Sequence, residues 1–340
     1  MPKNRLLSVL ACFLLAACGS FDEGDPECVG DDCGVEPGPG PEPIEDGMPP
    51  SVLSISPELG STDIASTDPI VIAFSEPMSP ESTLASVSIS PDAPLLSHDW
   101  NQDFTELTLR FGLADAEAVY PEEPGINEYA VTVSIVAEDT TGNELGEAVM
   151  ASFTTRRYQI HNFDPLGALG GHATEACPTC RYSFVGAGDY GGNRWHGYMT
   201  FDVSEFPSAL LGDVESAIID SHLRLIEGDP FGSFGDLHIA HSSFDSRAAA
   251  VTAPVFREYG VLIPASAAEE KGQYLADVTP AFREDIGDRI ERQGYSQYLL
   301  TFPNAPTAYT GGNFTWLYVN PDRAAEQGVP NTVLSIRTRY

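Results

Sequence analysis

The chain has 340 residues, 42% of them hydrophobic, which is enough apolar material for about two packed domains. It carries 50 acidic residues against 17 basic ones, a net charge of −33, so its surface repels nucleic acids and anionic lipids, and nucleic acid is not an expected partner. Such acidity favours solubility at high local concentration, and coordination of divalent cations is the alternative interpretation.

The first residues have the three parts of a secretory signal sequence. Lys3 and Arg5 are followed by a short apolar run, residues 6–15, and by two alanines. The apolar run is about half as long as the roughly 20 residues of a membrane-spanning helix, so we expect no permanent span here. The segment 15–18, Leu-Ala-Ala-Cys, resembles the lipobox of bacterial lipoproteins.

The resemblance to the lipobox implies cleavage of a signal peptide (1–17) and attachment of a diacylglycerol to Cys18. Two acyl chains are sufficient for stable anchoring, so a membrane is the first expected partner. Gly19 follows the cysteine, and in this family a residue other than aspartate favours sorting to the outer membrane. We therefore expect a lipid-anchored protein of the outer membrane or cell surface, with the membrane face left open. A plain secretory signal with a chance cysteine is the alternative.

Four cysteines remain once Cys12 leaves with the signal peptide and Cys18 is lipidated. They are Cys28, Cys33, Cys177 and Cys180. An even number of cysteines in an exported chain is typical of disulfides. We expect the two local pairings, 28 with 33 and 177 with 180, because the members of each pair are already close in sequence.

Residues 18–48 form an acidic linker rich in proline and glycine. Its segment 35–43 has four prolines in nine residues, and prolines lack the backbone donors that helices and sheets require. We expect an extended tether, stretched by its polyproline bias and by repulsion between its carboxylates.

Residues 49–157 show the period-two alternation of half-buried strands. The apolar runs are 70–74, 107–111, 129–135 and 149–153, and they are separated by clusters of Pro, Gly, Asp and Ser. No helical period of useful length is visible. The pattern predicts an all-β sandwich.

Three motifs give this segment a family resemblance. They are Ser54–Pro57 at its start, Ile72–Met78 with the run Phe-Ser-Glu-Pro-Met, and Asp139–Asn143 in a late turn. On these residues the segment resembles the bacterial Ig-like domain of surface-layer proteins of the SbsA type. The resemblance implies a spacer or adhesive unit without an active site.

Residues 158–340 form a second β-rich domain. Alternating apolar residues predict strands at 198–203, 221–225, 237–239, 298–302 and 333–336. One helix interrupts them: Thr279 is expected to cap its start, Pro280 fits its first turn, and Gly294 ends it. Its apolar face is formed by Phe282, Ile286 and Ile290. A shorter helical piece is expected at 265–271.

Several pieces of this second domain resemble the extracellular β-sandwich domain called DNRLRE. The similarity lies in Gly197–Ser204, Ser216–Ala217, Leu223–Leu225, Asp277–Phe282 and a closing strand after Pro330, whereas the segment 172–194 has no counterpart. The expected fold is therefore mainly β: a disordered linker, an Ig-like sandwich, then a larger jelly-roll-like sandwich with one or two short helices.

Cys177 and Cys180 could bind zinc together with His161, His172 or His196. A structural zinc site has paired ligands on both sides, and no second pair is present here, so we favour the disulfide and predict neither a metal site nor a cofactor.

Two further histidines, His238 and His241, lie three residues apart on a predicted strand and therefore face opposite sides of it. We expect them to be ordinary surface histidines.

The common catalytic motifs are missing from the sequence. It contains no Gly-x-Ser-x-Gly elbow, His-Glu-x-x-His helix or phosphate-binding loop. Pairs of acidic residues arise by chance in a chain with 50 of them. We therefore predict no catalytic residues and a protein that is not an enzyme, with a metal-dependent hydrolase in the C-terminal domain as the alternative.

Binding is the favoured function class. The expected loop Gly188–His196 and the segment Tyr309–Tyr318 combine aromatic rings with polar donors, which is how sugar rings are bound on sandwich domains. The candidate ligand-binding residues are Tyr190, Arg194, Trp195 and Trp316. Packing of these rings in the core is the competing interpretation.

We expect the Ig-like domain to act as a spacer and the C-terminal domain to bind a glycan or an envelope protein. Deleting residues 51–155 should then leave binding by the C-terminal domain unchanged. A purely structural spacer or assembly subunit is the remaining alternative.

Overall fold

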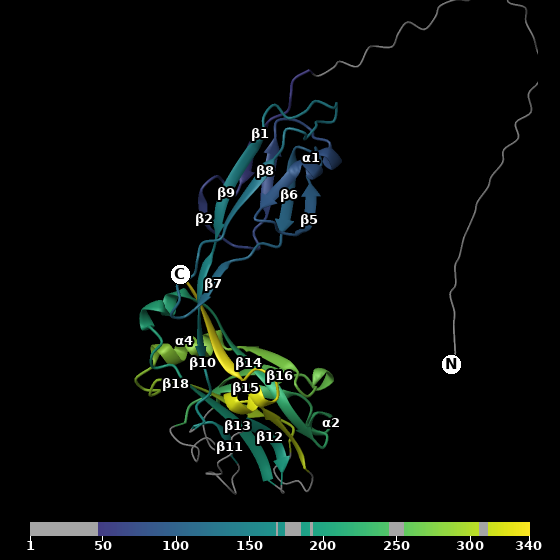
Figure 1. Ribbon diagram of the computed structural model, residues 1–340. Coiled ribbons are helices and arrows are strands. Elements are labelled where there is room, and N and C mark those ends of the chain that lie inside the picture. The colour runs from purple at the N-terminus through teal and green to yellow at the C-terminus, as the bar shows by residue number, and fades with distance from the viewer. Residues whose placement is uncertain (1–46, 168, 174–184, 191–192, 245–254, 306–311) are drawn as a thin grey trace, which may run out of the picture. The chain divides into compact units, whose positions relative to one another are not determined.

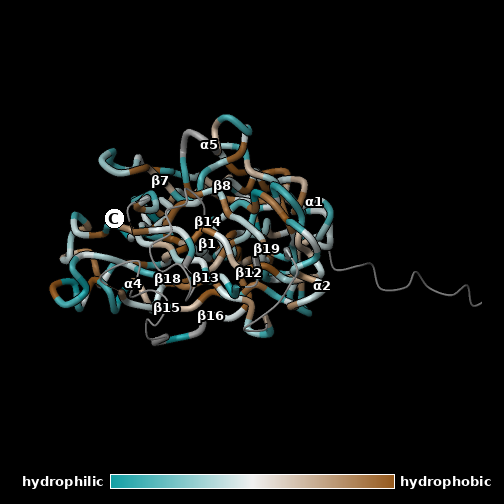
Figure 2. The backbone as a smooth tube through the Cα atoms, turned by 90° about the horizontal axis from the view of Figure 1, so that it is seen from below, coloured by the Kyte–Doolittle hydropathy of each residue, from teal (hydrophilic) through white to brown (hydrophobic). Residues whose placement is uncertain are grey.

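The computed structural model describes residues 47–340 except 168, 174–184, 191–192, 245–254 and 306–311 (Figure 1). The described part is mainly β, as predicted, with an Ig-like sandwich followed by a larger sandwich. In the hydropathy view, short hydrophobic and hydrophilic stretches alternate along the chain, as expected of strands with one buried face (Figure 2).

The Ig-like sandwich consists of two four-stranded sheets. The first has the order β1-β3-β6-β5, with bounds Val52–Ser56, Ile70–Phe74, Glu106–Phe111 and Leu95–Trp100. The second has the order β2-β9-β8-β4, with bounds Ser61–Ile64, Val149–Thr155, Glu128–Val133 and Val87–Ser90. Their inner faces meet in one core, which explains the alternation: Ile70, Ile72 and Phe74 are at most 2% exposed.

Two local predictions for this sandwich were wrong. The short helix α1 (Pro80–Ser86) interrupts the expected all-β segment. With seven residues it is too short to show a helical period, and only Pro80 in its first turn marks it. The third apolar run ends at Val133, and Ile135 lies outside the strand with 49% exposure.

The late motif 139–143 forms a turn that is held by one carboxylate. Asp139 is 2% exposed and accepts hydrogen bonds from the backbone and side chains of Thr141 and Asn143 at 2.7–2.9 Å. Burial by itself raises the pKa of Asp139, but the hydrogen bonds from Asn143 and Thr141 outweigh it and leave the pKa below its ordinary value. The motif residues therefore stabilise the turn itself.

The distal sandwich is built around one long, folded sheet of strands. Its order is β16-β15-β18-β13-β12-β19-β14-β20-β10-β7, with β11 paired to β13 and β17 paired to β14. The strand bounds are β7 Ala116–Val119, β10 Arg157–Phe163, β11 Gly171–Ala173, β12 Val185–Tyr190, β13 Asn193–Asp202, β14 Val214–Glu227, β15 Leu237–Ser242, β16 Val255–Ile263, β17 Gln273–Asp277, β18 Tyr295–Thr301, β19 Asn313–Leu317 and β20 Val333–Arg339.

Short helices connect these strands. They are η1 (Ser208–Asp213), α2 (Pro230–Phe234), η2 (Ala265–Ala267), α4 (Thr279–Gly287) and α5 (Pro321–Glu326). The core beneath them includes Met199, Phe201, Ile219, Phe282 and Leu300, each at most 1% exposed.

The predicted helix after residue 278 exists, but it is shorter than expected. Helix α4 begins with Thr279, whose hydroxyl contacts Asp277 at 2.6 Å instead of capping the helix. It ends at Gly287, so Phe282 and Ile286 are buried while Ile290 is 94% exposed. The spacing of three apolar residues did not show where the helix stops.

One strand of the distal sheet comes from the Ig-like segment of the chain. Between β6 and β8 of the Ig-like sandwich, residues 114–127 leave that sandwich, and their strand β7 pairs in parallel with β10. We call residues 114–127 the strap. Along the chain, the expected domain border near residue 157 lies between β9 and β10. The strap belongs to the first domain by its place in the sequence, but it pairs with a strand of the second.

Candidate binding site

Two of the predicted ligand-binding residues lie together on the distal sheet, on strands instead of loops. Trp195 is in β13 and Trp316 is in β19, and both strands pair with β12 between them. The indole rings are 6.5 Å apart at an interplanar angle of 70°, and both side chains are half-buried. The expected loop 188–196 is thus largely a hairpin of β12 and β13.

Two more rings complete an aromatic cluster, which we define as His172, Trp195, Phe314 and Trp316. The buried His172 ring lies 4.0 Å from Trp195 and 5.0 Å from Trp316. Phe314 meets Trp316 edge to face at 5.2 Å. Such pairs contribute about 0.5–1.5 kcal/mol each beyond the burial of area, so the rings hold one another in place.

Glycines on β12 make room for this cluster. A Cβ at Gly186 would lie 2.7 Å from the carbonyl oxygen of Thr315 and 3.0 Å from the Trp316 ring. At Gly188 the φ angle is +134° and a Cβ would lie 2.3 Å from the carbonyl oxygen of Asn313. The rings therefore lie directly against strand backbone, around a small hollow of about 10 Å³ lined by Gly186, Ala187, Trp195, Phe314, Thr315 and Trp316.

Arg194 is not part of the aromatic cluster. Its guanidinium donates to the carbonyl of Phe302 at 2.8 Å and contacts the hydroxyl of Thr301 at 3.3 Å. Neighbouring residues of a strand face opposite sides, so Arg194 points away from the ring of Trp195. The expected combination of guanidinium and indole in one site is therefore not formed by these two residues.

His196 lies beside Arg194 and contacts Thr301 Oγ1 through Nδ1 at 3.1 Å. Burial, together with the charge of Arg194, lowers the pKa of His196 from 6.5 to about 4. The imidazole is neutral at physiological pH and can serve as a hydrogen-bond partner but not as a cation.

Asp189 is a residue of this hairpin that the sequence did not single out. It is fully buried, and its two carboxyl oxygens have no hydrogen-bond partner in the described part of the chain. Burial raises the pKa of Asp189 and favours its protonated form. The run Gly-Asp-Tyr-Gly-Gly is typical of an ordinary turn, so it contained no signal of a buried acid.

The remaining predicted site residues lie largely outside the described structure. Tyr190 ends β12, but its side chain is not described. Cys18, Cys28, Cys33, Cys177 and Cys180 all lie outside the described residues.

The histidines proposed as alternative zinc ligands have other surroundings in the described part of the chain. His161 stacks on Tyr120 at 5.0 Å and packs edge to face against Phe206 at 5.2 Å, and burial lowers its pKa. His172 belongs to the aromatic cluster. Within the described residues, no group of three or more His, Cys, Asp or Glu side chains is arranged to hold a metal ion.

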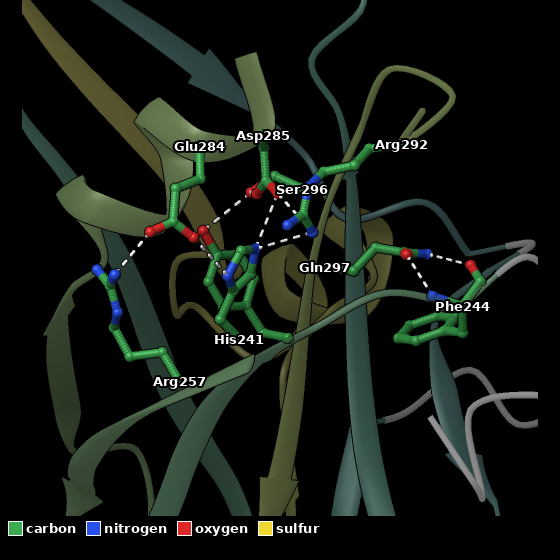
Figure 3. A network of polar contacts seen from close by, with 9 residues as sticks. His241, Phe244, Arg257, Glu284, Asp285, Arg292, Ser296 and Gln297 are labelled. Atoms are coloured by element: carbon green, nitrogen blue, oxygen red, sulfur yellow. Dashed lines mark hydrogen bonds and ion pairs between the residues drawn. The ribbon is translucent and has the colours of Figure 1, made fainter. Parts of the chain in front are cut away.

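The prediction that His241 is a surface histidine was wrong. His241 is fully buried, and its Nε2 lies 2.8 Å from Oδ1 of the equally buried Asp285 (Figure 3). Arg292 Nη1 lies 3.0 Å from the same oxygen, and Ser296 donates to Asp285 Oδ2 at 2.6 Å. We call these four residues the buried network.

The buried network connects helix α4 to the sheet. His241 comes from β15, Asp285 from α4 and Ser296 from β18. Ser296 hydrogen-bonds to the carboxylate and not to the imidazole, so the three groups are not in the order that activates a serine nucleophile. Burial raises the pKa of Asp285 despite hydrogen bonds from His241 and Ser296 and the nearby charge of Arg292. The geometry is that of a structural anchor.

Among the described residues, no helix is long and apolar enough to cross a membrane.

Comparison with known proteins assigns the first sandwich. Residues 46–155 match the family model of the bacterial Ig-like domain, and this segment is a bacterial Ig-like domain, as predicted. The match covers less than half of the chain and leaves the distal sandwich unassigned. No curated protein matches the chain.

Similarity to solved structures is weak. The bacterial S-layer protein SbsC (residues 31–844) is 15% identical with a TM-score of 0.23, and the match covers 45% of this chain and 23% of that one. The MG0-NIE-MG1 part of Escherichia coli alpha-2-macroglobulin is 11% identical with a TM-score of 0.28, covering 81% and 73%. The chain thus spans under a quarter of that S-layer protein, and scores this low carry no functional argument.

Proposed function

We propose that the protein is a lipid-anchored, non-enzymatic protein of the cell envelope or surface, whose distal sandwich binds a glycan through the aromatic cluster. The observation that carries this proposal is the pair of half-buried tryptophans on strands that flank β12, backed by glycines that keep the rings against the backbone. Flat aromatic faces of this kind bind the apolar faces of sugar rings by stacking. An envelope protein is the second candidate partner.

The Ig-like sandwich is proposed to act as a spacer. Three observations support this role: the matched family, the excess of 18 acidic side chains over one arginine within residues 51–155, and the acidic tether before the sandwich. The negative charge favours a solvated domain that is held away from an anionic membrane.

We expect Trp195→Ala and Trp316→Ala each to weaken glycan binding about fivefold, because the loss of one stacking platform costs about 1 kcal/mol. The ligand is first identified by screening the full soluble chain against a glycan array, and the affinities of the variants are then measured by calorimetry. Trp100→Ala is the matched control, because Trp100 is also half-buried but lies in the Ig-like sandwich.

The fold of each tryptophan variant is checked by circular dichroism. If Trp195→Ala and Trp316→Ala both unfold the distal sandwich, the cluster belongs to the core and the proposed site is wrong. If both fold and bind as tightly as the unmodified chain, a different surface carries recognition.

The anchor is tested by Cys18→Ala, which removes the only residue on which the lipobox resemblance places the acyl chains. We expect the variant to move from the membrane fraction to the soluble fraction while its thermal unfolding stays unchanged. Recovery of the variant with membranes at unmodified levels after a high-salt wash would contradict lipid anchoring.

A further inference from the structure

The strap makes a continuous backbone contact with the distal sheet. Strand β7 runs parallel to β10, and the residues paired at the two ends of the contact are Ala116 with Arg157 and Val119 with Ile160. Two backbone hydrogen bonds of 2.8 Å mark the ends of this contact, from Ala116 N to Arg156 O and from Tyr120 N to Ile160 O. Because β7 ends the strand order of the sheet, it covers an edge of β10 that would otherwise be open.

A side chain near the C-terminal end of the sequence, Arg337, binds the start of the strap. Arg337 in β20 lies 2.6 Å from Glu117 and 3.0 Å from Asp115, and its guanidinium stacks 3.5 Å above the ring centre of Tyr158. Asp115 also accepts a hydrogen bond from the backbone of Ser66 in the Ig-like sandwich. One arginine of the distal sandwich thus holds two carboxylates of the strap, and the planar contact with tyrosine fixes its direction.

The second half of the strap is held by β10. Arg157 donates to the carbonyls of Pro124 and Gly125 at 2.8 and 3.2 Å. Gln159 donates to the carbonyl of Glu122 at 3.1 Å. The ring of Tyr120 stacks on His161 at an interplanar angle of 24°, so the strap is fixed along its whole length.

We propose that the strap joins the Ig-like and distal sandwiches into one cooperative folding unit, in which the edge of β10 is an interaction surface whose partner is a strand of the same chain. The two sandwiches are joined covalently by Arg156 alone between β9 and β10, and the strap adds a second, noncovalent attachment. The edge of β10 needs this cover, because an open strand edge pairs readily with other chains.

The strap also changes the expected result of deleting the Ig-like domain. Deleting residues 51–155 would remove the strap together with the Ig-like sandwich. The distal sheet would then lose its edge strand β7, and the edge of β10 would be open. The Ig-like domain is therefore more than an exchangeable spacer, and binding by the distal sandwich is to be tested in the full chain.

The experiment uses two proline variants of the full soluble chain. The backbone bonds at residues 116 and 120 show that even-numbered amides of β7 point toward β10, so Ala118→Pro removes a donor from the contact. Val119→Pro is the matched control, because its amide points away from β10 and its side chain is 53% exposed. Unfolding is followed by differential scanning calorimetry.

We expect one unfolding transition for the unmodified chain and for Val119→Pro, and two separate transitions for Ala118→Pro. The lower of the two should lie at least about 5 °C below the original midpoint. Two independent transitions in the unmodified chain, or identical behaviour of both proline variants, would overturn the proposal.

A milder pair of variants decides between the outcomes if Ala118→Pro does not fold. Arg337→Met and Glu117→Gln should each lower the midpoint, and the double variant should lower it by less than the sum, because both remove the same contact. The control is Arg257→Met with Glu284→Gln, an ion pair inside the distal sandwich that is also partly exposed, which should leave the number of transitions at one. Strict additivity of the Arg337 and Glu117 changes would contradict coupling through the strap.

Discussion

Replacing Asp285 by alanine is expected to destabilise the distal sandwich by about 3–5 kcal/mol, more than any of the other substitutions proposed for this protein. The carboxylate is fully buried and accepts a hydrogen bond from the Ser296 hydroxyl at 2.6 Å. Its other oxygen lies 2.8 Å from His241 Nε2 and 3.0 Å from Arg292 Nη1. Its removal takes away the acceptor shared by the fully buried imidazole and by the guanidinium, which is 13% exposed, so part of their desolvation is no longer offset.

The matched control is Glu284→Ala on the neighbouring residue of helix α4. Glu284 also forms an ion pair, with Arg257 at 2.6 Å, and its other oxygen lies 3.6 Å from His241 Nδ1, but the side chains of Glu284 and Arg257 are at least 40% exposed (Figure 3). An exposed pair contributes less than about 1 kcal/mol, so the two variants differ in burial more than in chemistry. Urea unfolding followed by tryptophan fluorescence measures both. Equal losses for Asp285→Ala and Glu284→Ala would show that the buried network does not anchor α4.

Acidification is expected to destabilise the protein between pH 6.5 and about 4, and His196 should account for about 3 kcal/mol of the loss. Burial and the charge of Arg194 lower the pKa of His196 from 6.5 to about 4 in the folded chain. As the pH falls below 6.5, His196 binds a proton in the unfolded chain, whereas in the folded chain it stays neutral until about pH 4. Stability is therefore lost across this window and the loss ends below it.

The measurement is the free energy of unfolding as a function of pH for the unmodified chain and for His196→Gln. The glutamine variant should show a weaker dependence on pH between 6.5 and about 4, whatever its stability at higher pH. His98→Gln serves as the control, because His98 is exposed on β5 of the Ig-like sandwich. If the pH profiles of His196→Gln and the unmodified chain coincide, His196 is not held neutral by the fold.

Most strands could be predicted from the sequence because one face of each is buried. In β3, for example, Ile70, Ile72 and Phe74 point into the core while the residues between them are half-buried. The same rule failed for β12 and β19. Gly186 and Gly188 have no side chains that could alternate, so the sequence pattern predicts a loop where the structure has β12, the strand between the two strands that carry the tryptophans.

The buried network and the strap could not be predicted, because both depend on contacts that have no local signature. His241 and Asp285 are 44 residues apart, and each resembles an ordinary surface residue of a strand or a helix. The strap has few large apolar residues, and its turn signal Pro124-Gly125 does not indicate a parallel partner. Pairing partners in a sheet are chosen by the whole fold, so a pattern within one segment gives no information about them.

The position of the strap in the chain has a consequence for the order in which the protein folds. Asp115 precedes its partner Arg337 by 222 residues, and Gln159 in β10 precedes Thr338 in β20 by 179. Contacts this distant require the closure of large loops and form late, whereas both sheets of the Ig-like sandwich are complete once residue 155 has been made. During synthesis β10 follows residue 155 directly and can pair with the strap, but the other edge of β10 stays unpaired until β20 has been made. In that interval the growing chain exposes the edge of β10 that β20 covers in the native fold, so its aggregation is expected to depend on how fast the last strands follow.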